Sequence, residues 1–129
     1  MCIRDSLYGE QIGGRLEDMG SFAKYIGGSP TNTSIGASRL GLKTALITRV
    51  GNDAMGRFIR EELHREGVST DHVKTDMDRL TALVLLGIRD TESFPLIFYR
   101  ENCADMAICE EDISEEPVSY THLRSPRDS

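Results

Sequence analysis

The residues best suited to chemistry stand in one short run, GGSPTN, at Gly27–Asn32. Two adjacent glycines let the main chain approach a ligand closely and permit positive φ angles. The residues that follow indicate a helix, whose first N–H groups are unpaired and point toward the same place. Asn32 adds a side chain that both donates and accepts hydrogen bonds. The run predicts a site for a small polyol, although a Gly-Gly turn before a helix is also common as plain punctuation.

Other familiar nucleotide and metal motifs are missing from the sequence. No Gly-Lys-Ser/Thr follows the glycines, which argues against a Walker-type phosphate loop. Cys103 and Cys109 lack the spacing of zinc ligands, and His64 and His72 have no partner in sequence. We therefore expect these side chains to be structural and predict no metal site. Cys2 lies in an N-terminal segment that we expect to be adapter-derived, and the two remaining thiols favour a reducing compartment, so we expect a cytoplasmic protein.

The elements that must position the glycine run alternate between helix and strand. Pro30–Leu40 predicts a helix, because proline suits a first turn, and Gly41 ends it. Lys43–Val50 is rich in β-branched residues and predicts a strand. Apolar residues at helical spacing predict a second helix over Ala54–Glu66.

The second half of the chain favours strands. His72–Thr75 predicts a short strand, and the apolar runs Thr81–Ile88 and Phe94–Tyr99 predict a hairpin. Pro95 places the last of these strands at a sheet edge. Leu7–Tyr25 holds several glycines, so we expect irregular or short-strand structure there. The alternation as a whole predicts an α/β fold.

Composition restricts the class of protein. With 39% hydrophobic and 28% charged residues, the chain has the composition of a soluble globular protein. A net charge of −6 argues against a general attraction to nucleic acid. No apolar run approaches the ~20 residues that a membrane helix needs. We therefore expect neither nucleic acid nor membrane as a partner.

The two ends of the chain are related as antisense copies. The first five residues, MCIRD, back-translate to codons whose reverse complement encodes VSYTH, the sequence at Val118–His122. Folding gives no reason for this relation, whereas one inverted adapter sequence at both ends of a sequenced insert does. We therefore expect residues 1–6 and about 117–129 to be adapter-derived, like other scars that are excluded from fold reasoning. Residues 7–116 are then one incomplete natural domain.

The spacing of glycines beyond the first run resembles a known family signature. The paired glycines, Asn32, Gly41 and Gly51 follow the N-terminal pattern of the ribokinase-like sugar kinases, the phosphofructokinase-B (PfkB) family. That family commonly continues with a Gly-x-Asp-x-x-Gly turn, and GNDAMG at Gly51–Gly56 matches it. The run FYRENCADMA is similar to members that act on keto-sugar acids. The resemblance covers nearly all of residues 7–116.

The resemblance implies a ribokinase-like fold: a mostly parallel sheet flanked by helices, with further strands that form a lid over the sugar. It implies that Gly27, Gly28 and Asn32 bind sugar hydroxyls. Arg100 stands at the Tyr-Arg position where related kinases bind a substrate carboxylate, although a surface arginine at a strand end is an equally good interpretation. The apolar strands of the second half would form the lid. We expect the parent protein to form a homodimer through them, because exposed apolar strands favour pairing.

Two features of the family are missing. Its first-strand aspartate falls at Ser6, within the expected adapter sequence, and Asp5 is not a substitute for it. The Gly-Ala-Gly-Asp motif, whose aspartate is the family's general base, is absent from the sequence. In the family, ATP and Mg²⁺ also bind mostly through that second half. Because phosphoryl transfer depends on positioning and charge stabilisation, we expect the parent to be an ATP-dependent sugar kinase and this chain to be inactive, with no catalytic residue.

Three interpretations of function follow. The leading one is the sugar-binding part of a kinase for a keto-sugar acid, with 2-keto-3-deoxygluconate or a neutral ketose left open as substrate. The second is a non-catalytic sugar-binding module that dimerises through its strands, and the adapter-like ends argue against it. The third is a Rossmann-type nucleotide domain, and the missing G-x-G-x-x-G fingerprint argues against it.

Overall fold

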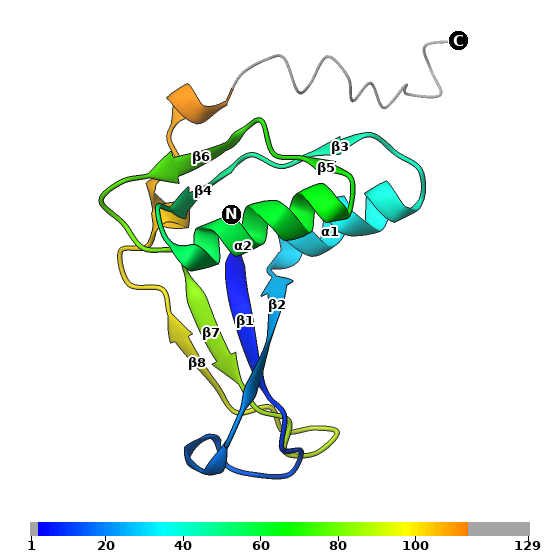
Figure 1. Cartoon of the computed structure of the whole chain (residues 1–129), viewed down its shortest axis with the longest axis vertical. Coiled ribbons are helices and arrows are strands. Elements are labelled where there is room, and N and C mark those ends of the chain that lie inside the picture. Colours follow the sequence, from blue (N-terminus) through cyan, green and yellow to red (C-terminus); the bar gives the residue numbers. More distant parts are fainter. Residues whose placement is uncertain (1–2, 114–129) are drawn as a thin grey trace.

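The computed structural model describes residues 3–113, which form a sheet that projects from a body of two helices and short strands (Figure 1). The projecting sheet has four strands in the order β2-β1-β7-β8, and we call it the lid sheet. Its strands are β1 (Arg4–Gly9), β2 (Phe22–Gly27), β7 (Leu83–Leu86) and β8 (Leu96–Tyr99). β1 pairs antiparallel with β2 and parallel with β7, and β7 pairs antiparallel with β8.

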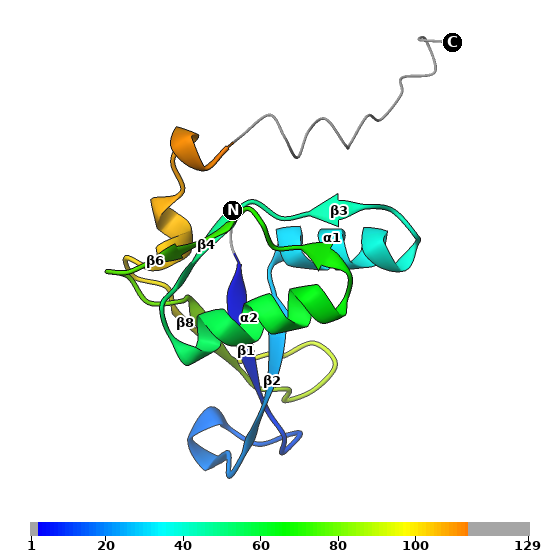
Figure 2. The ribbon, with the colours of Figure 1, turned by 45° about the horizontal axis from the view of Figure 1, so that its top comes forward.

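The body contains two helices and two parallel strand pairs. In both views the helices lie side by side on one side of the short strands (Figures 1 and 2). β3 pairs with β5, and β4 pairs with β6. The elements of the body are α1 (Ser29–Arg39), β3 (Thr44–Ala45), β4 (Thr48–Gly51), α2 (Ala54–Arg65), β5 (Val68–Ser69) and β6 (Val73–Asp76). Single 3-10 turns lie at Leu16–Asp18, Ala104–Ala107 and Glu110–Asp112.

The hydrophobic core lies between α2 and the body strands. Ile59 and Leu63 are both fully buried, and they share one face of α2 because they are four residues apart. The other buried members of this cluster are Ile3, Leu46, Val50, Val68 and Val73. The core therefore fixes α2 against β4 and its neighbours, while the lid sheet keeps large apolar side chains exposed.

Both predicted helices and the predicted hairpin are confirmed, and β8 is an edge strand as Pro95 indicated. The predicted strand over Lys43–Val50 is interrupted, because β3 and β4 are separated by two residues. The N-terminal region is more regular than expected, since β1 and β2 pair over six residues each. Residues 4–6, which the sequence sets apart as adapter-like, form the first half of β1. Within the described chain, no helix is both long and apolar enough to cross a membrane.

Candidate functional site

The paired glycines form the corner at which β2 leaves the lid sheet and α1 begins. Gly28 is the N-cap residue of α1, with φ 98° and ψ 146°. Residues with a Cβ rarely adopt this backbone conformation. No side chain caps the helix start, so its first N–H groups keep their capacity to bind an outside acceptor. The sequence prediction of a main-chain binding corner therefore has the required local geometry.

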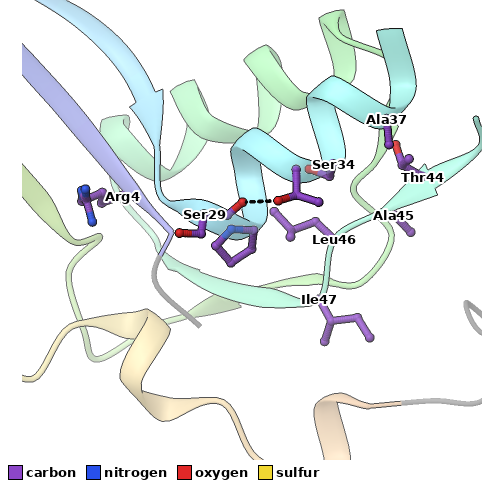
Figure 3. A pocket seen from close by; sticks show the side chains of 10 residues that line it. Arg4, Ser29, Ser34, Ala37, Thr44, Ala45, Leu46 and Ile47 are labelled. Atoms are coloured by element: carbon purple, nitrogen blue, oxygen red, sulfur yellow. Dashed lines mark hydrogen bonds between the residues drawn. The ribbon is translucent and has the colours of Figure 1, made fainter. Parts of the chain in front are cut away.

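The Thr33 hydroxyl does not occupy the binding corner. Thr33 Oγ1 donates a hydrogen bond to the main-chain oxygen of Ser29 at 2.8 Å, back along the helix (Figure 3). Asn32 N donates to Gly28 O at 3.0 Å, which closes the first helical turn. The groups that the corner presents outward are therefore main-chain amides, which suit hydroxyl or other oxygen acceptors.

Position 6 of β1 lies directly against the first glycine. A Cβ added to Gly27 would lie 2.7 Å from Ser6 Oγ, closer than real Cβ atoms approach. Ser6 itself is buried. A Cβ at position 27 would therefore have to displace the Ser6 hydroxyl from its place at the corner. Position 6 is where the family signature expects an aspartate.

A cavity of about 770 Å³ opens beside this corner, between α1 and the strand segment 44–47. Figure 3 shows Arg4 and Ser29 at one end of it and Ala37 and Thr44 at the other. Ser29 and Pro30, the first residues of α1, line this space, which is large enough for a small ligand, whereas Gly27 and Gly28 are not among its lining residues.

Asn32 faces a different space. It lines a second cavity of about 450 Å³ between β2, α1 and α2, together with Lys24 and Phe58. Lys24 Nζ lies 4.4 Å from the centre of the Phe58 ring. The structure thus brings Gly27, Gly28 and position 6 together but places Asn32 on the neighbouring side of the corner. Its contact with a sugar stays a prediction.

Arg100 lies at the opposite edge of the lid sheet, one residue beyond β8. Three strand spacings, about 14 Å, separate the first and last strands of the order β2-β1-β7-β8. The guanidinium is already engaged: Nε donates to Asp105 Oδ2 at 2.9 Å, and Nη2 lies 2.8 Å from the same oxygen. Asp105 is almost fully buried. Asp105 stands in the run FYRENCADMA, but its pairing with Arg100 was not predicted, because nothing in the sequence shows that this 3-10 turn brings the two side chains together.

In the second glycine turn, Gly51–Gly56, the Asp53 carboxylate is fully engaged in hydrogen bonds to neighbouring groups. Asp53 Oδ1 accepts from Gly56 N at 2.7 Å and from Thr81 Oγ1 at 2.8 Å, and Oδ2 accepts from Thr81 N at 2.9 Å. Burial raises the pKa of Asp53, but these hydrogen bonds outweigh it and hold the pKa below the ordinary value. Because Thr81 immediately precedes the β7 region, the turn ties the body to the lid sheet.

Asp5 is a buried carboxylate on β1 with neither oxygen hydrogen-bonded. Burial, together with the nearby charge of Asp53, raises the pKa of Asp5 to about 7, while Lys24 acts in the opposite direction. Its β-strand neighbour Ser6 points to the other face of the sheet. Asp5 therefore does not lie at the glycine corner and cannot serve as the family's sugar-binding aspartate.

Comparison with known proteins identifies relatives over most of the chain. The model of the pfkB family of carbohydrate kinases matches residues 2–121. The 5-dehydro-2-deoxygluconokinase of Geobacillus thermodenitrificans (strain NG80-2) is 40% identical over 119 residues, which are 92% of this chain and 35% of that enzyme. The chain thus spans about a third of the length of such relatives.

Solved structures agree with the fold. A sugar kinase of Pyrococcus horikoshii in complex with ATP superposes with a TM-score of 0.83 at 33% identity, over 90% of this chain and 37% of that chain. A fructokinase of Halothermothrix orenii superposes with a TM-score of 0.73, also at 33% identity, over 84% of this chain and 38% of that chain. The prediction of a ribokinase-like α/β fold, present here in part, is confirmed.

Proposed function

Because the chain belongs to the pfkB family of carbohydrate kinases, we propose that it is the sugar-binding part of an ATP-dependent sugar kinase. The observation that carries the proposal is the corner at Gly27 and Gly28. There an uncapped helix start, a positive-φ glycine and position 6 meet beside a cavity. Main-chain amides at such a corner bind hydroxyl oxygens at close range without a side chain in the way.

The proposed substrate is a keto-sugar acid such as 5-dehydro-2-deoxygluconate, an intermediate of myo-inositol catabolism. The relatives at 40% identity carry that substrate in their name. In this proposal Gly27, Gly28 and Asn32 bind hydroxyls, and Arg100 binds the carboxylate. An arginine fork matches a carboxylate by paired hydrogen bonds.

A neutral ketose is the alternative substrate. The fructokinase of Halothermothrix orenii matches the chain at 33% identity, and a guanidinium can also donate to sugar hydroxyls. Among the keto-sugar acids, 2-keto-3-deoxygluconate is a second candidate.

The phosphoryl chemistry falls outside the described residues. ATP supplies the phosphoryl group, and Mg²⁺ neutralises the charge that develops on it. Among residues 3–113, no group of three His, Cys, Asp or Glu side chains could hold a metal ion. We assign the nucleotide site and the general base to the remainder of the parent protein.

The lid sheet also supports a proposal for assembly. All four side chains of β8 are between 44% and 53% exposed, although all are large and apolar or aromatic. Exposed apolar edge strands favour pairing with another chain. We propose that the parent protein is a homodimer that covers this strand, and that it works in the cytoplasm. Sedimentation of the parent as a monomer would contradict the dimer.

The function is tested by assaying the full-length parent with ATP against 5-dehydro-2-deoxygluconate, 2-keto-3-deoxygluconate and fructose. The proposal expects phosphorylation, with the highest kcat/KM for the first acid. The 129-residue chain should show no sugar-dependent ATP turnover under the same conditions. Absence of sugar kinase activity in the parent, or robust turnover by the chain alone, would refute the proposal.

A further inference from the structure

Arg100 and Asp105 form an ion pair whose two side chains differ strongly in solvent exposure. The Asp105 side chain is 1% exposed, whereas Arg100 keeps 34% exposure. Arg100 Nε donates a hydrogen bond to Asp105 Oδ2, and Nη2 lies 2.8 Å from the same oxygen. The other oxygen, Oδ1, is buried and has no hydrogen-bond partner. The buried member therefore depends on Arg100, while the arginine still reaches the surface.

The position of Asp105 is set by the main chain around it. Ala104 N donates to Leu80 O at 2.9 Å, which fixes the start of the 3-10 turn to the segment ahead of β7. Asn102 adopts a left-handed conformation with φ 49°, and its Oδ1 accepts from Arg79 Nε at 3.1 Å. Cys103 is buried between them. The turn therefore holds the carboxylate in place as a fixed reference point at the end of β8.

A fixed carboxylate determines how the arginine is presented. The guanidinium is planar and its donors are arranged in a rigid fork. Two contacts to Asp105, at Nε and Nη2, therefore set the plane of the group. Arg100 follows Phe98 in the strand alternation, and Arg4 lies 5.1 Å over the Phe98 ring from β1. Phe98 and Arg4 therefore share one face of the lid sheet, and Arg100 follows two residues after Phe98, just beyond the end of β8.

We propose that Asp105 is a positioning residue, which orients Arg100 to receive the carboxylate of an acidic sugar whose hydroxyls lie at the glycine corner. This inference rests on the proposed function and deepens it. Asp105 touches no substrate in this account and acts only through the arginine. Because it also offsets the arginine's charge, the pair selects an acid by the direction of its donors rather than by net charge.

The test compares Asp105→Asn with the unchanged enzyme in the full-length parent. Asparagine keeps the size and one acceptor but loses the charge that holds both guanidinium contacts. We expect KM for 5-dehydro-2-deoxygluconate to rise about tenfold while kcat changes less than about twofold. KM for fructose, which has no carboxylate, should stay within about twofold, so the preference for the acid falls.

A matched control is Asp112→Asn. Asp112 is equally buried in a 3-10 turn, and it accepts from Arg49 Nε at 2.5 Å and Arg49 Nη2 at 2.9 Å. This second pair joins the turn to β4, within the body. We expect a comparable loss of stability from Asp112→Asn, but no change in the ratio of the two KM values. The control separates a general effect of breaking a buried ion pair from an effect on Arg100.

Each outcome decides the inference. An unchanged KM for the acid in Asp105→Asn, or equal rises for acid and ketose in both variants, overturns the positioning role. If Asp105→Asn does not fold, Asp105→Glu keeps the charge but moves it by one methylene. It should then raise the KM for the acid alone, and an unchanged KM would overturn the role. A parent enzyme that phosphorylates no sugar would instead refute the proposed function itself.

Discussion

The two glycine turns at Gly27–Asn32 and Gly51–Gly56 both start a helix, but the N–H groups at the two helix starts differ in whether a side chain accepts hydrogen bonds from them. α2, with 12 residues, is capped by Asp53, whose carboxylate accepts from Gly56 N. α1, with 11 residues, has Gly28 at the same position and no side-chain cap. In the second turn, a side chain accepts a hydrogen bond from an N–H group of the helix start. In the first turn no side chain does so, and a cavity lies beside it.

The difference shows that one family signature combines two kinds of glycine. In the second turn the glycines are required by packing: a Cβ on Gly56 would overlap the main-chain oxygen of Gly51. In the first turn Gly28 is required by its backbone angles, and a Cβ on Gly27 would have to displace the side chain at position 6. A ligand site is therefore indicated by a helix start without a side-chain cap, rather than by the number of glycines.

The largest expected effect comes from Gly56→Ala. Its Cβ would overlap main-chain atoms of Gly51, which cannot rotate away, so α2 would have to move from β4. We expect loss of more than about 3 kcal/mol, or loss of folding. Gly36→Ala is the matched control, because Gly36 is also helical but has no atom within 4 Å of an added Cβ. It should stabilise the chain by about 0.5–1 kcal/mol. Urea denaturation followed by circular dichroism measures both.

The next effect is a dependence of stability on pH through Asp5, which lies close enough to feel the charge of Asp53. Its pKa is raised from 3.8 to about 7 in the folded chain, so the charged form is disfavoured there. The penalty is complete above pH 7, shrinks as the pH falls toward 4 and vanishes below the unfolded pKa. The full shift corresponds to at most about 4 kcal/mol.

We therefore expect the free energy of unfolding to rise between pH 8 and pH 5. Asp5→Val should remove this rise and stabilise the chain at pH 8. Asp53→Asn should shrink it, because one of the two causes is lost. Stability that is flat or falls over this interval in the unchanged chain would contradict the environment described for Asp5.

Asp53→Ala should cost about 3 kcal/mol, because it removes the cap of α2 and leaves Thr81 N without its acceptor. Asparagine at this position keeps one acceptor oxygen and should cost less. Thermal unfolding of the two variants ranks them. Equal stability of Asp53→Ala and the unchanged chain would mean that the second turn is not closed by this side chain.

Gly28→Ala should have the smallest effect on stability and a large effect on sugar binding. The positive φ angle predicts a cost of about 1–3 kcal/mol. Gly41→Ala is matched to it, since Gly41 also has a positive φ, of 87°, and open space around it. In the full-length parent, only Gly28→Ala should raise KM for the sugar. Equal KM values in the two variants would remove the first turn from the site.

Local patterns predicted the elements that depend on nearby residues. The α2 helix followed from the helical spacing of apolar residues such as Ile59 and Leu63, and the strand hairpin followed from two apolar runs. The register that places position 6 against Gly27 could not be predicted, because it depends on pairing between segments some twenty residues apart. The pairing of Arg100 with Asp105 depends in the same way on a tight turn that carries no motif.

Asp5 shows a different limit of prediction. A carboxylate buried without a hydrogen-bond partner runs against the usual cost of burying charge. This misfit is consistent with the expectation that residues 1–6 derive from adapter sequence. A natural residue at this position would be expected to be apolar, like the buried Val84 of the neighbouring strand β7.

The central claim is that the main-chain amides around Gly27 and Gly28 hold the hydroxyls of a sugar. A crystal structure of the full-length parent with its sugar bound tests it most directly. The account predicts sugar oxygens within about 3 Å of the main-chain nitrogens of residues 27–29. A sugar that is bound elsewhere, with this corner left without ligand contact, would contradict the claim.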